Sequence, residues 1–154
     1  MKRILAVLLI IFMLTACGKQ TTKRLEVQVP LNAVVSATVN GIDYSAKLEA
    51  FPDGKANFTV NIPEDINGLK LNFSSDGCQV IYGDVKTEYS KSAISPCFEG
   101  LFSVLSEIRT TEADSIVQSG ETVEVKYGKN SAVYDTQNEK FIQINANGIL
   151  WNFE

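Results

Sequence analysis

The chain has 154 residues, with 14 basic and 18 acidic side chains and no histidine. The absence of histidine removes the commonest general base and the commonest metal ligand, which excludes Ser-His-Asp, Cys-His and histidine-based zinc chemistry. The acidic balance argues against nucleic acid as a partner, because phosphate backbones bind basic surfaces. We expect no cofactor.

The first residues predict export. Lys2 and Arg3 precede an apolar run from Ile4 to Leu14, and the small residues Thr15 and Ala16 follow it. This is the layout of a secretory signal peptide. A helix of that length spans roughly 16 Å, against about 30 Å of hydrocarbon core, so the run is too short for a stable transmembrane segment.

The end of the run carries a more specific resemblance. Leu14-Thr15-Ala16-Cys17 resembles the lipobox of bacterial lipoproteins, and Gly18 after it is common in that family. The resemblance implies cleavage before Cys17 and a diacylglycerol on its sulfur, and two acyl chains suffice for stable anchoring. The alternative is an ordinary signal peptide with a chance cysteine. We expect an exported protein, anchored on the extracytoplasmic face of a cell membrane or an outer membrane.

The predicted organisation has three parts. Residues 1–16 are a cleaved lipoprotein signal peptide, residues 17–23 are the lipidated cysteine and a short tether, and residues 24–154 are a single β-rich domain. Without the leader, 138 residues remain, with 12 basic and 18 acidic side chains and a net charge of −6. The tether reaches at most about 20 Å, so the domain lies close to the membrane. We expect a monomer.

Two further cysteines, Cys78 and Cys97, suggest a disulfide in an exported protein. It would close a loop of about 20 residues and contribute around 3 kcal/mol in the chain-entropy model. The alternative is a pair of buried thiols.

The first part of the domain has the alternation of apolar and polar residues expected of strands. Leu25, Val27 and Val29 alternate in this way, and Asn40-Gly41 is a strong signal for a two-residue hairpin turn. Further turns are indicated at 52–54 and 76–77. We expect strands at Arg24–Val29, Ala33–Val39, Ile42–Phe51, Lys55–Ile62, Leu69–Phe73, Cys78–Tyr82 and Val85–Tyr89.

A helix is predicted after Ser95-Pro96, because serine is a good N-cap and proline suits the first helical position. One apolar stripe at helical spacing then extends over about three turns: Phe98, Leu101, Phe102, Leu105 and Ile108. Glu112 to Gln118 predicts a second short helix, closed by Gly120.

The C-terminal part returns to strand patterns at Thr122–Tyr127, Ser131–Asp135, Phe141–Asn145 and Ile149–Phe153. The last of these is expected to be an edge strand that buries Trp151 and Phe153. The fold class is therefore α+β: a curved, mostly antiparallel, half-barrel-like sheet, with one main amphipathic helix and a second short helix covering its concave face.

The middle of the domain resembles a second family. Phe58 to Pro63 is a strand that ends in proline, Leu69 to Phe73 is the next strand, and Asp76-Gly77 turns into Val80-Ile81-Tyr82-Gly83. This resembles the strand pattern of LolA-like lipoprotein carriers and lipid-binding lipoproteins. The resemblance implies an open curved sheet around an apolar cavity that holds a lipid or lipoprotein acyl chain. The chain departs from that family in lacking a long helix before the first strand.

Two functions compete. The first is amphiphile binding in a cavity of several hundred Å³ between sheet and helix, lined by the stripe Phe98, Leu101, Phe102, Leu105 and Ile108. The second is an envelope interaction or scaffold protein, in which the same stripe simply fills the core. We expect no enzyme, because the acidic pairs Glu64-Asp65 and Glu112/Asp114 have local explanations in a turn and at a helix N-terminus.

Overall fold

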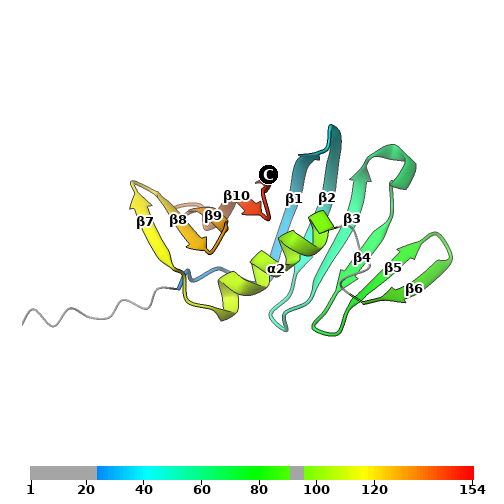
Figure 1. Cartoon of the computed structure of the whole chain (residues 1–154), viewed down its shortest axis with the longest axis horizontal. Coiled ribbons are helices and arrows are strands. Elements are labelled where there is room, and N and C mark those ends of the chain that lie inside the picture. Colours follow the sequence, from blue (N-terminus) through cyan, green and yellow to red (C-terminus); the bar gives the residue numbers. More distant parts are fainter. Residues whose placement is uncertain (1–23, 91–95) are drawn as a thin grey trace, which may run out of the picture.

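The computed structural model describes residues 24–90 and 96–154 (Figure 1). Within them the chain forms one open antiparallel sheet of eleven strands. A single α-helix, α2 (Pro96–Thr110), lies across one face of this sheet, and a short 3₁₀ turn, η1 (Glu64–Ile66), follows the third strand. The predicted antiparallel sheet with one covering helix is confirmed.

The strands form two meanders. The first contains β1 (Leu31–Val39), β2 (Ile42–Ala50), β3 (Ala56–Ile62), β4 (Lys70–Phe73), β5 (Cys78–Tyr82) and β6 (Val85–Tyr89). The second contains β7 (Ser115–Ser119), β8 (Thr122–Tyr127), β9 (Asn130–Asp135), β10 (Lys140–Ala146) and β11 (Ile149–Phe153). They join where β1 pairs with β11, which gives the order β6-β5-β4-β3-β2-β1-β11-β10-β9-β8-β7. β11 is therefore a central strand and not the predicted edge strand.

Local turn chemistry sets the hairpins. Asn40 and Gly41 both have positive φ, of 52° and 79°, and they connect Val39 directly to its partner Ile42. Two positive φ values in a two-residue loop are what a type I′ turn requires, and Asn-Gly adopts them at least cost. Asn147 and Gly148 repeat this arrangement between β10 and β11, with φ of 55° and 85°. The tight turn predicted at Asn40-Gly41 is confirmed.

The helix packs its apolar stripe onto the sheet. It runs for 15 residues, about four turns and one more than predicted. All five stripe residues are at most 6% exposed. At the start of the helix the Phe98 ring lies 5.4 Å from that of Phe58 on β3 and 5.3 Å from that of Trp151 on β11. The helix thus binds the two meanders together across the seam between β1 and β11.

The second helix, predicted at Glu112 to Gln118, is wrong. Residues 115–119 form β7, an edge strand in which Ile116 pairs with Val125 of β8. The β-branched Ile116 and Val117 favour an extended backbone. Gly120, interpreted as a helix stop, lies in the two-residue loop between Ser119 and Thr122. Pairing with β8 therefore overrides the weak local helix signal.

The strand predicted from Arg24 to Val29 is also wrong, although its alternation is real. Leu25, Val27 and Val29 are half-buried and the residues between them are exposed, yet the segment forms no strand. Pro30 offers no N–H for a ladder bond, and β2 ends at Ala50, opposite Leu31. The residues before Leu31 therefore have no strand to pair with.

Candidate functional site

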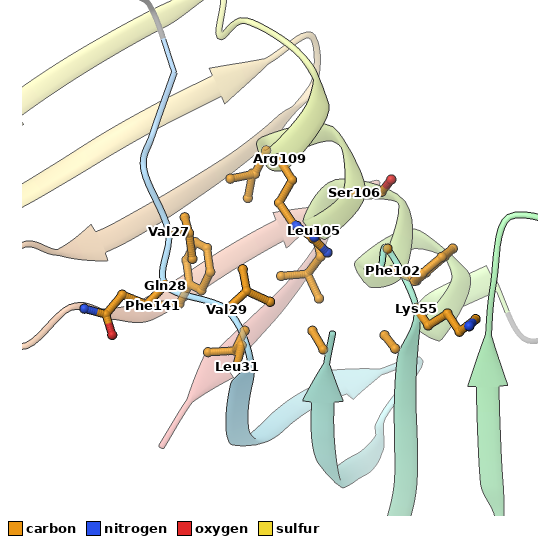
Figure 2. Close-up of a pocket in the computed structure, with 14 residues that line it drawn as sticks. Val27, Gln28, Val29, Leu31, Lys55, Phe102, Leu105, Ser106, Arg109 and Phe141 are labelled. Carbon is orange, nitrogen blue, oxygen red and sulfur yellow. The ribbon is translucent and has the colours of Figure 1, made fainter. Parts of the chain in front are cut away.

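Residues Arg24–Pro30, called the N-terminal segment below, lie across the molecule beside the C-terminal half of α2 (Figure 2). Two side-chain hydrogen bonds hold the segment. Arg24 Nη2 donates to the Thr110 carbonyl at 2.6 Å, and Gln28 Nε2 donates to Glu139 Oε2. Among the residues that the structure describes, no backbone–backbone hydrogen bond joins the segment to the sheet. The backbone of Gln28 is also hydrogen-bonded to the Tyr134 hydroxyl.

An apolar groove lies between the N-terminal segment, α2 and the β2–β3 turn. Figure 2 shows Val29 of the segment and Leu105 of the helix pointing toward each other across it. Its lining includes Val27, Val29, Leu31, Ala50, Ala56, Phe102, Leu105, Ile108 and Phe141. The free space is about 20 Å³, which is enough for one water molecule. In this conformation the apolar side chains of the segment fill the groove.

A larger open hollow lies on the other side of the segment. It has a volume of about 440 Å³ and is lined in part by Tyr134, Thr136 and Glu139. Val27 and Gln28 line both the hollow and the groove, so the N-terminal segment is the partition between them. The floors of the groove and of the hollow are in contact. Phe141 lines the groove and Tyr134 lines the hollow, and their rings meet edge to face with centroids 5.2 Å apart.

The rim of the groove carries two cations. Arg109 donates from Nη1 to the Phe51 carbonyl at 2.7 Å, which ties the end of α2 to the β2–β3 turn. Lys55 pairs with Asp53 at 2.6 Å. The hydrogen bond from Lys55 lowers the pKa of the Asp53 carboxyl, and the same contact raises the pKa of Lys55, so this lysine remains charged. Both rim cations therefore have partners in the closed structure: a carboxylate for Lys55, and the Phe51 and Pro52 carbonyls for Arg109.

The residues predicted to line a cavity separate into two groups. Phe102, Leu105 and Ile108 do line the groove. Phe98 and Leu101 do not line it and are enclosed in the core, 2% and 0% exposed. In residues 24–90 and 96–154 no cavity of several hundred Å³ lies directly between sheet and helix, because the helix stripe is packed against the strands. Cys17 lies outside the described residues.

Sequence reasoning missed the other wall of the groove. The sequence predicts strands for Val27 and Val29 and for Phe141, and no site at any of them. Their apolar alternation was visible in the sequence, but nothing in it said that this stretch leaves the sheet and crosses to the helix. The segment leaves the sheet because β2 ends at Ala50, opposite Leu31, and the residues before Leu31 have no neighbouring strand to pair with.

The remaining reactive side chains form no second site. Cys78 and Cys97 are both buried, and no disulfide joins them, which is the alternative that the sequence left open. Burial raises the pKa of the Cys78 thiol to about 11. Asp114 accepts a hydrogen bond from the Gly128 N–H at 2.6 Å, so this carboxylate has a structural role in the turn after β8. In residues 24–90 and 96–154 no three acidic or cysteine side chains are grouped as a metal site would require.

No helix in the described part of the chain is both long and apolar enough to span a membrane. The sequence matches no family model and no curated protein. Among solved structures, the chain has a likeness to the LolA superfamily protein NE2245 from Nitrosomonas europaea, with a TM-score of 0.34 and 8% identity. The likeness covers 73% of this chain and 60% of that one, so the chain spans less than two thirds of that protein. A likeness of this strength assigns no family to the chain.

Proposed function

We propose that this protein is an envelope lipoprotein, anchored by lipid on Cys17, which binds a single amphiphile in the groove when the N-terminal segment moves aside. The observation that carries the proposal is the partition itself. One segment, which has no backbone–backbone hydrogen bond to the sheet in the described residues, separates an apolar groove from an open hollow of about 440 Å³. Joining the two spaces gives a concave site in the size range of small-molecule pockets, apolar in the groove and polar in the hollow, where Glu26 and Glu139 lie.

The cost of opening is moderate. Leu25, Val27 and Val29 are half-buried, so exposing each costs roughly 1 kcal/mol. Each of the two side-chain hydrogen bonds contributes about 1 kcal/mol. The seven freed residues regain backbone entropy of roughly 1 kcal/mol each, which is as large as the sum of those contacts. Opening therefore involves two opposing terms of similar size, and we propose that the open state is a minor one that a ligand selects.

Recognition of the ligand divides between the two ends of the site. Leu105, Ile108 and Phe141 offer an apolar surface to the chain of the amphiphile. Lys55 and Arg109 line the groove and, on binding, exchange their present partners (Asp53 and the Phe51 and Pro52 carbonyls) for its headgroup. An anionic single-chain amphiphile, such as a fatty acid, matches both ends best.

The anchor and the site share one stretch of chain. The proposed tether, residues 17–23, continues directly into the N-terminal segment that covers the groove. Movement of this segment is therefore coupled to the membrane attachment, and the site would open within about 20 Å of the lipid surface.

A second candidate is an envelope interaction protein without a small-molecule ligand. The filled interior favours it, because the stripe on α2 is wholly buried and the groove holds only about 20 Å³. This candidate predicts that delipidated protein takes up no amphiphile.

A fatty-acid titration separates the two candidates. The chain from Gly18 onward, delipidated and checked for folding by circular dichroism, is titrated with the fluorescent fatty acid cis-parinarate. We expect saturable 1:1 binding that hexadecanoate competes away. Linear, non-competable uptake would support the interaction protein instead.

Charge reversal at the rim sharpens this test. Lys55→Glu should weaken binding of the anionic probe about fivefold to tenfold and leave a neutral monoacylglycerol unaffected. Lys47→Glu is the matched control, because Lys47 is equally exposed, at 57% against 60%, and pairs with Glu49 at 2.7 Å. Equal effects of the two reversals would remove Lys55 from the site.

A further inference from the structure

One end of the open sheet has an unpaired backbone edge. β6 is the terminal strand there, and among the described residues it pairs only with β5 (Figure 1). The two strands are joined by the two-residue loop at Gly83-Asp84, so Tyr82 and Val85 form the hydrogen-bonded pair that closes it. Because such pairs alternate along an antiparallel ladder, Lys86 and Glu88 direct their N–H and C=O groups away from β5.

We propose that β6 pairs antiparallel with β6 of a second copy of this chain, about a two-fold axis at Thr87. In this register Thr87 opposes its own copy, Lys86 opposes Glu88, and Val85 opposes Tyr89. The interface is isologous, so every contact occurs twice. The two sheets become one continuous sheet through the edge. This proposal is independent of the amphiphile site.

Charge selects this register. Outward-facing backbone groups must meet outward-facing groups, so β6 can slide only by two residues at a time relative to its copy. A slide in one direction places Lys86 opposite Lys86, and a slide in the other places Glu88 opposite Glu88. Only the register centred on Thr87 places opposite charges together, on both sides of the axis.

The partners of these charges within one chain are weak. Glu88 accepts a hydrogen bond from Gln79 at 3.4 Å. Lys86 makes no ion pair in the part of the chain that the structure describes. Both side chains are exposed and available to a second copy.

The opposite face of the strand is complementary too. Val85 is 68% exposed and Tyr89 is 45% exposed, although both are apolar or aromatic. The same register brings them directly opposite each other, as a β-branched residue beside an aromatic ring, which is a favourable cross-strand pair. One register therefore satisfies the backbone, the charges and the apolar side chains together.

The other edge strand lacks this specificity. β7 contains Ser115, Ile116, Val117, Gln118 and Ser119, without any charge. Nothing in that sequence distinguishes one register from another or one partner from another. A second copy is thus the partner that β6 fits, in place of the monomer expected from the sequence.

Disulfide trapping tests the register. The full-length chain carrying Thr87→Cys is expressed in cells, oxidised mildly and run on a non-reducing gel. Opposed residues have Cβ atoms about 5 Å apart, so a disulfide-linked dimer should form. Val85→Cys is the matched control on the same strand. It is more exposed, but the two copies of residue 85 lie about 13 Å apart along the strands, beyond disulfide reach.

We expect the Thr87→Cys chain to cross-link at least tenfold more than the Val85→Cys chain. Cross-linking that is equal in the two variants, or absent from Thr87→Cys, overturns the proposal. A charge exchange in the Thr87→Cys background provides the second measurement. Lys86→Glu should reduce dimer about tenfold, and adding Glu88→Lys should restore it. Failure of the double exchange to restore dimer also overturns the proposed register.

Discussion

Loosening the N-terminal segment should tighten ligand binding. The double variant Val27→Ala/Val29→Ala removes apolar contacts that hold the segment over the groove, while it leaves the walls on α2 and β10 intact. If the segment must move before an amphiphile enters, the variant binds more tightly because its open state is more populated.

The magnitude follows from burial. Each Val→Ala change removes two methyl groups, worth about 1.5 kcal/mol when fully buried, at roughly 0.8 kcal/mol per group. Val27 and Val29 are only half-buried, so the two changes together destabilise the closed state by about 1.5 kcal/mol. Apparent affinity should rise about tenfold, provided that the closed state still dominates.

The assay compares cis-parinarate titrations of the variant and the unaltered chain, with urea unfolding followed through Trp151. This is the only tryptophan, and it is fully buried, so its fluorescence reports the core. Val39→Ala/Val80→Ala is the matched control, because these valines are also half-buried against the core but do not line the groove. We expect unchanged affinity in the control.

Either of two results would refute this reasoning. Weaker binding by the Val27→Ala/Val29→Ala chain would mean that these valines contact the ligand instead of excluding it. An equal gain in the control variant would mean that general loosening of the fold, and not the segment, limits binding.

Three further predictions concern stability and charge. Phe98→Ala should lower the free energy of unfolding by about 3–5 kcal/mol in urea titrations, because Phe98 is 2% exposed and packs on aromatic rings from both meanders. A loss below about 1 kcal/mol would contradict the role of Phe98 in joining the meanders. The free energy of unfolding should fall as pH rises from about 9 to about 11. Burial raises the pKa of Cys78 from an ordinary 9.0 to about 11, so only the unfolded thiol ionises in this range. Cys78→Ala should flatten this part of the plot of stability against pH, and an unchanged slope would show that Cys78 is not the group responsible. Ile116→Ala should change stability by less than about 0.5 kcal/mol in the same urea assay, since Ile116 lies 39% exposed on an edge strand, and a loss above about 1 kcal/mol would show that β7 is packed.

Much of the fold could be predicted because its signals are local. Asn40-Gly41 and Asn147-Gly148 specify their own turns, and the stripe from Phe98 to Ile108 specifies its own buried face. These elements need no knowledge of distant residues.

The failures depend on distant partners. Residues 115–119 became a strand because β8 pairs with them, and residues 24–30 failed to become one because β2 ends at Ala50, opposite Leu31. β11 became central through pairing with β1, more than a hundred residues earlier in the chain. The groove shows the same difference between local and distant signals. The side chains that α2 contributes to it could be predicted from the helix stripe, whereas those of Val27 and Val29 depend on where the N-terminal segment lies, which no local pattern specifies.

Movement of the N-terminal segment is the central claim, and a distance measured by electron spin resonance tests it most directly. Spin labels at Glu26→Cys and Thr136→Cys, which both line the hollow, report the distance between the segment and β9–β10, and the native Cys78 and Cys97 are buried from the label. We predict a short distance without ligand and a second, longer population that grows with added hexadecanoate. A distribution that stays unchanged while hexadecanoate binds would contradict the account.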